Sequence, residues 1–267
     1  MYGLLGRNGA GKSTLLNLIA SQMFPSNGEI KVFGKAPYEN RDVLKDICLI
    51  KESGTFIKDI KVKDALYIAS LFYQNWDKNL AKKLVEDFEL DTEKTFKSLS
   101  LGMKSQVSII VGLSSRAPLT IFDEPYIGLD APGRQFFYDS LIEDYSENPR
   151  TIIISTHLID EVSNLLEEVI ILHKGEVRLT GNIDDIREKA FYLNGSKEKM
   201  QAYLQNKNVL AGENIGNNMV AAVFDNITSN EKTAMESDGL NIKSISLQQL
   251  FINLTGGKII KGGGSNE

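Results

Sequence analysis

The sequence predicts an α/β fold, in which a mostly parallel β-sheet carries an inserted helical subdomain and is followed by a small α+β module. Two observations lead to this expectation. Short apolar runs alternate with segments of helical period, which is typical of a parallel sheet flanked by helices. Between the third and fourth runs, apolar residues recur at helical spacing over a long stretch, so an all-helical segment interrupts the sheet.

Six apolar runs are expected to form the strands of the sheet, because they are short, continuous and bounded by turn residues. The helical insertion is expected over Val62–Leu113, in a subdomain of about residues 54–115. The expected strands are Tyr2–Leu5, Glu29–Phe33, Ile47–Ile50, Leu119–Asp123, Thr151–Ser155 and Val169–His173.

The character of the chain changes after Gly175. E-V-R-L-T-G predicts a short antiparallel strand and Ile183–Lys189 a linking helix. From Ala190 onward, strand-like and helical segments alternate as in a compact α+β unit. We therefore expect a main domain at residues 1–189, an accessory module at 190–257 and a flexible tail at 258–267. The module's expected strands are F-Y-L-N, V-A-A-V-F and I-K-S-I, and its expected helices are Lys197–Asn206, Ser229–Ser237 and Leu247–Leu254.

The composition argues against several classes of protein. The net charge is -5, from 30 Lys plus Arg against 35 Asp plus Glu, so no basic field favours nucleic acid, and no nucleic-acid partner is expected. The single Cys48 excludes an intramolecular disulfide framework and fits a reducing compartment. No apolar run approaches the roughly 18 residues of a membrane span, and the start of the chain does not resemble a signal peptide.

The segment G-R-N-G-A-G-K-S-T has the pattern and the context of a phosphate-binding P-loop, since it follows an apolar strand and precedes a helical run. Its glycines bring backbone N–H groups onto phosphates, and the following helix directs its positive dipole end at them. The alternative, a glycine-rich turn with an incidental lysine, does not explain this context. The fold class is therefore a P-loop NTPase with a RecA-like sheet. The expected nucleotide contacts are Gly6, Arg7, Asn8, Gly9, Ala10, Gly11, Lys12, Ser13 and Thr14.

Two carboxylates end the apolar run L-T-I-F-D-E, at the sheet edge where the P-loop is expected. Asp123 is expected to hold Mg²⁺ together with the Ser13 hydroxyl, and Glu124 to act as the general base on the attacking water. Lys12 is expected to lie between the β- and γ-phosphates of ATP. Without the P-loop, such a pair is more often a solvated loop; with it, we expect a hydrolytic site.

Two further segments, L-S-L-G-M at Leu99–Met103 and E-P-Y-I-G-L-D at Glu124–Asp130, flank this carboxylate pair. Together with the P-loop, they closely resemble the motifs of ATP-binding cassette (ABC) ATPases, in the family's order, over about residues 1–181. The resemblance implies that two cassettes, identical or different, close head to tail around ATP. It further implies that Ser100 and Gly102 contact the nucleotide of the partner cassette, and that Asp130 is the D-loop aspartate at the nucleotide and the dimer contact.

Two more residues receive a role from the resemblance. His157, at the end of I-I-I-S-T-H, matches the switch histidine on the γ-phosphate, although a lone histidine after a strand is usually structural. Glu52 stands where the family often has the Q-loop glutamine, and a Lys-Glu pair there is otherwise ordinary surface.

The resemblance also implies a membrane partner. The S-x-G-M form of the signature is similar to that of exporter cassettes of antibiotic-resistance and acetoin-type systems. We thus expect an ATPase that powers a separate integral membrane permease and lies peripherally at the cytoplasmic face of the cell membrane. The family places about thirty residues and an aromatic A-loop before the P-loop, so an upstream truncation is expected here. A soluble ABC-type ATPase and a non-hydrolysing nucleotide-binding regulator remain as alternatives.

Overall fold

The computed structural model describes residues 1–51 and 57–256. The chain forms two compact units, each considered by itself. The first comprises residues 1–157 with 174–176, and the second comprises residues 158–173 with those from 177 onward. The first unit ends before the domain boundary that the sequence predicts at residue 189, and that boundary stays a prediction.

The first unit is built on four parallel strands in the order β2-β3-β4-β1. Continuous burial of these apolar runs explains why they form central strands, as covered parallel strands require. The register pairs Asp123 with Ser155, so the carboxyl ends of β3 and β4 meet at one edge. The strands are β1 Tyr2–Gly6, β2 Ile47–Ile50, β3 Leu119–Asp123 and β4 Thr151–Thr156.

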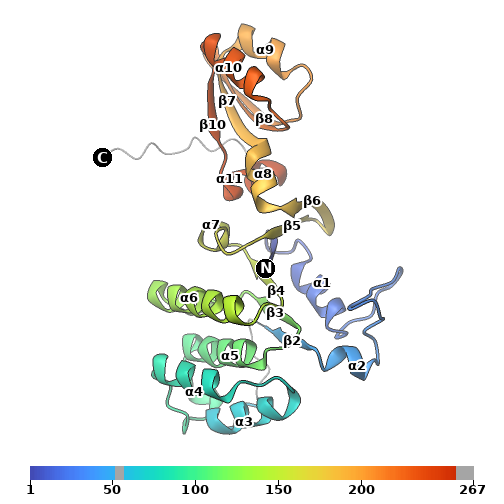
Figure 1. Cartoon of the computed structure of the whole chain (residues 1–267), viewed down its shortest axis with the longest axis vertical. Helices are drawn as coiled ribbons and strands as arrows, with labels where there is room; N and C mark the ends of the chain where they lie inside the picture. The colour runs from blue at the N-terminus through green and yellow to red at the C-terminus, as the bar shows by residue number, and fades with distance from the viewer. Residues whose placement is uncertain (52–56, 257–267) are drawn as a thin grey trace. The chain divides into compact units, whose positions relative to one another are not determined.

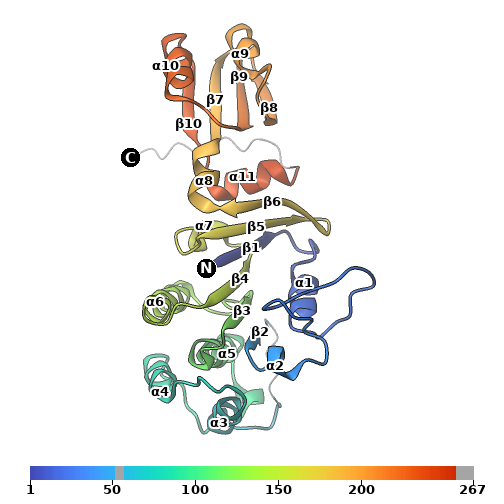
Figure 2. The same cartoon turned by 45° about the vertical axis from the view of Figure 1, so that its right-hand side comes forward.

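Helices cover both faces of these strands. The helices α1 (Lys12–Ile19) and α2 (Arg41–Leu44) lie on one side, and α5 (Leu101–Ser115) and α6 (Ala131–Glu147) lie on the other (Figures 1 and 2). Helices therefore cover both faces of these four strands.

The prediction of a strand at Glu29–Phe33 is wrong. Only an isolated antiparallel bridge from Val32 to Lys35 forms there. Phe33 and Gly34 both have positive φ values, 52° and 75°, which turn the chain back on itself. Phe33 is also 52% exposed, so no core face holds this segment extended.

The helical insertion is confirmed by α3 (Val62–Phe72), α4 (Lys78–Asp87), a 3₁₀ turn at Phe96–Ser98 and α5. Helix α5 begins at Leu101, because the Ser100 side chain accepts a hydrogen bond from the Met103 N–H and caps the helix. Helix α5 is almost wholly buried from Val107 to Ser115, which explains its apolar composition on all sides.

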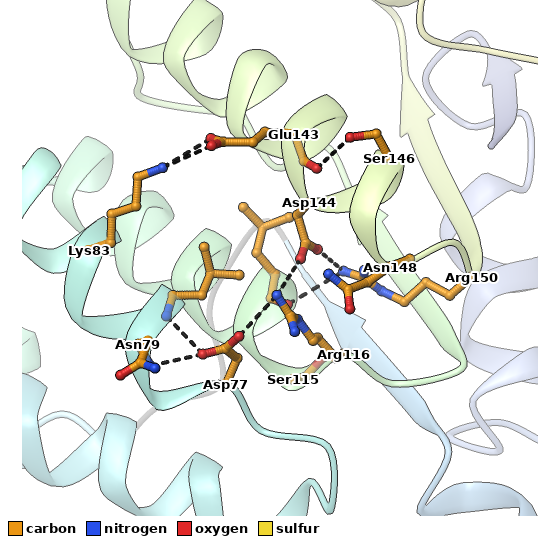
Figure 3. Close-up of polar contacts among 12 residues, drawn as sticks. Asp77, Asn79, Lys83, Ser115, Arg116, Glu143, Asp144, Ser146, Asn148 and Arg150 are labelled. Carbon is orange, nitrogen blue, oxygen red and sulfur yellow. Dashed lines mark hydrogen bonds and ion pairs between the residues drawn. The ribbon is translucent and has the colours of Figure 1, made fainter.

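A buried ionic cluster links the ends of α4, α5 and α6 (Figure 3). Asp144 of α6 lies 2.7 Å from Arg150 Nη2 and 3.3 Å from Arg116 Nη2. Arg116 also lies 2.9 Å from Asp77, whose other oxygen caps the first turn of α4. Asn148 offers its carbonyl oxygen to Arg150. The cluster thus joins the helical insertion to α6 and to the loop that precedes β4.

The second unit begins with α7 (Ile159–Val162), the adjacent strands β5 (Glu168–His173) and β6 (Glu176–Asn182), and α8 (Ile183–Lys189). The expected strand after Gly175 and the expected linking helix are confirmed. In the described ranges, 1–51 and 57–256, no helix is long and apolar enough to cross a bilayer.

A four-stranded antiparallel sheet in the order β10-β7-β9-β8 forms the rest of the second unit. The element sequence βαββαβ and this order make it a ferredoxin-like arrangement. Its core holds side chains of β7, α9, β9 and α10, including Leu193, Met200, Val223 and Met235. The elements are β7 Ala190–Ser196, α9 Lys197–Leu204, β8 Val209–Ile215, β9 Asn218–Phe224, α10 Ser229–Ser237, β10 Asn241–Ser244 and α11 Leu247–Leu254.

Candidate functional site

The loop between β1 and α1 has the backbone conformation that the glycine pattern predicts. Gly9 and Gly11 have φ values of 78° and 104°, a region that disfavours residues with a side chain. The Ala10 N–H donates to Arg7 O at 3.0 Å, and the Ala10 carbonyl accepts from the Gly175 N–H at 2.9 Å. Among residues 1–51 and 57–256, no side chain caps the start of α1, which leaves its first N–H groups available for an anion.

Lys12 begins α1 and brings a positive charge into this loop. Its ammonium donates to the Gly6 carbonyl at 2.7 Å and lies 3.3 Å from Glu124 Oε1. The side chain is 8% exposed, so the charge is held largely out of water. Ser13 and Thr14 are exposed at the same helix end. The structure therefore unites the P-loop with the second carboxylate of the predicted pair.

The two carboxylates at the end of β3 have different surroundings. Asp123 is buried, and its Oδ1 atom has no hydrogen-bond partner among the residues that the structure describes. A buried carboxylate oxygen without a donor is unusual, and it suits a hard cation such as Mg²⁺. Glu124 has a φ of 51°, and its N–H donates to Ser155 O at 3.1 Å.

The Glu124 carboxylate is the centre of a buried polar network. Its Oε2 atom lies 2.9 Å from His157 Nδ1 and accepts a hydrogen bond from the Tyr126 hydroxyl. The Tyr126 hydroxyl also lies 2.7 Å from Thr156 Oγ1 and accepts the His157 N–H at 3.2 Å. Burial first, and then the contact with Glu124, raise the pKa of Tyr126 well above its ordinary value.

Tyr126 is a residue of this site that the sequence motifs did not indicate. Its only signal was a polar aromatic residue two positions after Glu124, in a segment that already carried another motif. The tight turn after β3 returns this side chain to the sheet edge, where it meets the end of β4.

The signature segment packs against the segment that follows Glu124. A Cβ atom on Gly102 would lie 2.5 Å from the Gly128 carbonyl oxygen, so the two backbones touch. Asp130 caps α6 by accepting the Gly133 N–H at 2.9 Å. Within the described residues, no hydrogen bond or ion pair joins Ser100, Gly102 or Asp130 to the P-loop.

Glu52, which was predicted to occupy the Q-loop position, lies outside the described residues. In the part of the chain that the structure describes, no group of three or more His, Cys, Asp or Glu side chains could enclose a metal ion.

Comparisons with known proteins agree with this geometry. The model of the ABC transporter family matches residues 1–127. The bacitracin transport ATP-binding protein BcrA of Enterococcus faecalis is 31% identical over 71% of this chain, which spans only 62% of that relative. The ABC transporter ATP-binding protein NatA of Bacillus subtilis (strain 168) is 31% identical, covering 70% of this chain and 79% of NatA.

A solved ATP-binding subunit of an ABC transporter has a similar fold. It superposes with a TM-score of 0.63 and 28% identity, covering 70% of this chain and 80% of that structure. The α/β class with a P-loop and a largely parallel sheet is confirmed.

Proposed function

Because this chain belongs to the family of ABC transporter ATP-binding proteins, we propose that it binds and hydrolyses ATP to power a separate integral membrane permease. The observation that carries this proposal is the direct approach of Glu124 to Lys12. It places a candidate general base beside the cation that is expected to bind phosphate, at the edge of a parallel sheet.

The phosphates of ATP are bound by the loop Gly6–Thr14. Its N–H groups and the start of α1 contact the phosphate oxygens, and the Lys12 ammonium lies between the β- and γ-phosphates. Ser13 and Asp123 would hold Mg²⁺, and that ion would supply positive charge to the phosphate oxygens. The unpartnered Oδ1 atom of Asp123 supports this assignment.

Hydrolysis uses Glu124 and His157. A water oxygen attacks the γ-phosphorus while the Glu124 carboxylate accepts the water proton, and the bond to the β–γ bridging oxygen breaks, releasing ADP and phosphate. His157, whose side chain is 49% exposed, contacts the γ-phosphate from the end of β4. The contact of His157 Nδ1 with Glu124 supports a joint role for the two residues.

The site is completed by a second cassette, identical to this chain or different from it. Ser100, Gly102 and the start of α5 present a second helix N-terminus to the partner's nucleotide, and Asp130 lies at the contact between cassettes. The tight packing of Gly102 on Gly128 supports this role, because it ties the signature segment to the loop that leaves Glu124.

An apolar groove supports docking to a permease. Its volume is about 300 Å³, and it lies between α3, α5 and the end of β2. On its rim, Phe72 is 71% exposed and Ile68 is 40% exposed. Exposed apolar clusters of this kind commonly mark interaction sites. The chain then lies peripherally at the cytoplasmic face of the membrane, and the resemblance to a bacitracin transport protein favours export.

The proposal is tested by comparing wild type with Glu124→Gln in a steady-state phosphate-release assay. The amide keeps the shape but cannot accept the water proton, so turnover is expected to fall by about 100-fold or more. Glu143→Gln, an exposed α6 carboxylate, is the matched control and is expected to be silent. ATP binding by both variants is measured by calorimetry. If wild type releases phosphate no faster than Glu124→Gln, the hydrolytic role of Glu124 is refuted. A non-hydrolysing nucleotide-binding regulator is then the better assignment.

A further inference from the structure

The Tyr126 hydroxyl contacts four polar atoms that belong to three residues of the site. It bonds to Glu124 Oε2, lies 2.7 Å from Thr156 Oγ1, accepts the His157 N–H at 3.2 Å and lies 3.3 Å from His157 Nδ1. Only 4% of Tyr126 is exposed, so water does not compete for these contacts.

The protons of this network can be assigned from its chemistry. A phenol has one proton to donate and two lone pairs that accept. The oxygen accepts the His157 N–H, and an ionised Glu124 only accepts, so the phenolic proton lies toward Glu124. Thr156 Oγ1 then donates to the remaining lone pair. Every group is satisfied in this arrangement, and the raised pKa of Tyr126 keeps the hydroxyl a neutral donor across the working pH range.

The two oxygens of Glu124 are held by different partners. Oε2 receives Tyr126 and, at 2.9 Å, His157 Nδ1, whereas Oε1 faces Lys12 at 3.3 Å. Lys12 attracts the carboxylate toward the P-loop, and Tyr126 opposes this pull from the side of β4. Without the phenolic donor, the Glu124 carboxylate keeps the His157 Nδ1 contact but loses one of the two partners that hold Oε2 against the pull of Lys12.

We propose that Tyr126 is a positioning residue for hydrolysis, which orients the Glu124 carboxylate and couples it to His157 through one buried hydroxyl. The inference rests on the proposed role of Glu124 as general base. Since misplacement of a reacting group by about 1 Å can cost about 100-fold in rate, Tyr126→Phe is expected to lower kcat by about 10- to 100-fold. The nucleotide loop is untouched, so KM for ATP is expected to change by less than about 2-fold.

The test compares Tyr126→Phe, Glu124→Gln and the double variant in the ATPase assay, with ATP binding measured by calorimetry. Tyr138→Phe is the matched control, because Tyr138 is also 4% exposed but lies on α6. We expect kcat to fall in Tyr126→Phe with KM retained, no change in Tyr138→Phe, and no further loss when Tyr126→Phe is added to Glu124→Gln.

Each other outcome is decisive. Wild-type kcat in Tyr126→Phe would overturn the inference, as would an equal additional loss in the Glu124→Gln background. Failure of Glu124→Gln to lower turnover would instead overturn the proposed hydrolytic role itself. If Tyr126→Phe does not fold, Thr156→Val carries the test, because it removes the donor to the Tyr126 hydroxyl; its kcat is expected to fall with KM retained, and an unchanged kcat would refute the coupling.

Discussion

Replacing Asp144 by alanine is expected to destabilise the first unit far more than replacing its neighbour Glu143. The Asp144 side chain is 1% exposed and pairs with Arg150, which is 6% exposed, and with Arg116 (Figure 3). Its removal leaves a buried guanidinium without a counter-charge, which costs about 3–5 kcal/mol. Glu143 is 62% exposed and pairs with Lys83, so its loss costs at most about 1 kcal/mol.

The comparison is well controlled because both substitutions convert an acidic residue to alanine at adjacent positions of one helix. Changes in helix propensity therefore nearly cancel. Trp76, the only tryptophan, directly precedes Asp77 of the cluster, so its fluorescence reports unfolding of this unit. With a urea m-value of about 2 kcal/mol/M, the midpoint is expected to fall by about 2 M for Asp144→Ala and by less than about 0.5 M for Glu143→Ala.

Equal shifts for the two variants would refute this reasoning, since they would mean that the buried pair contributes no more than the exposed one. Asp144→Asn is the second variant. It keeps the shape of the side chain but removes its charge, so it separates lost packing from lost ion pairing. We expect Asp144→Asn to resemble Asp144→Ala, because neither carboxylate oxygen of Asp144 has a well-directed hydrogen bond and the contacts act mainly through charge.

Two further predictions concern other parts of the chain. Hydrogen bonds from the Thr228 backbone and from Lys207 lower the pKa of Glu231 to about 2 from 4.5, so its stabilising effect is present above pH 4.5 and is lost as the pH falls toward 2. The Tm values of wild type and Glu231→Gln should therefore differ at pH 7 and converge near pH 2; a constant gap would contradict the assignment. Phe72→Glu in the apolar groove should lower the fraction of chain recovered with membranes of the source cells, whereas Ile142→Glu, an exposed apolar residue of α6, should not. Equal recovery of the two variants would argue against the groove as the docking site.

The sequence predicted best those elements whose own residues show a clear apolar pattern. The buried strands and the amphipathic helices belong to this class. Strand β8 was not predicted, because Ala211 and Gly212 weaken its apolar pattern and it lies at the edge of the sheet, paired with β9. Its signal was the turn at Gly216-Asn217, a pair typical of tight hairpins. The segment Glu29–Phe33 shows the opposite error, since its pattern suits a strand but, in the described part of the chain, it forms only the isolated bridge from Val32 to Lys35.

In the candidate site, too, some features follow from the local sequence pattern and others depend on contacts between distant parts of the chain. Motif spacing was sufficient to place Lys12 and the Asp-Glu pair at one edge of the sheet, because parallel strands end together. The network around the Glu124 carboxylate depends instead on how the chain turns after β3, and that turn is set by contacts from β4 and from Tyr126 rather than by local propensity.

The backbone at Glu124 shows why that turn matters. A φ of 51° is unfavourable for a residue with a side chain and costs of the order of 1–3 kcal/mol. The Ser155 carbonyl, which accepts the Glu124 N–H, and the side-chain contacts with Tyr126 and Lys12 hold the residue there. A glycine would adopt this backbone without strain but would supply no carboxylate. The presence of glutamate in a glycine-like conformation therefore indicates that the orientation of its side chain, and not the stability of the turn, is what this part of the structure maintains.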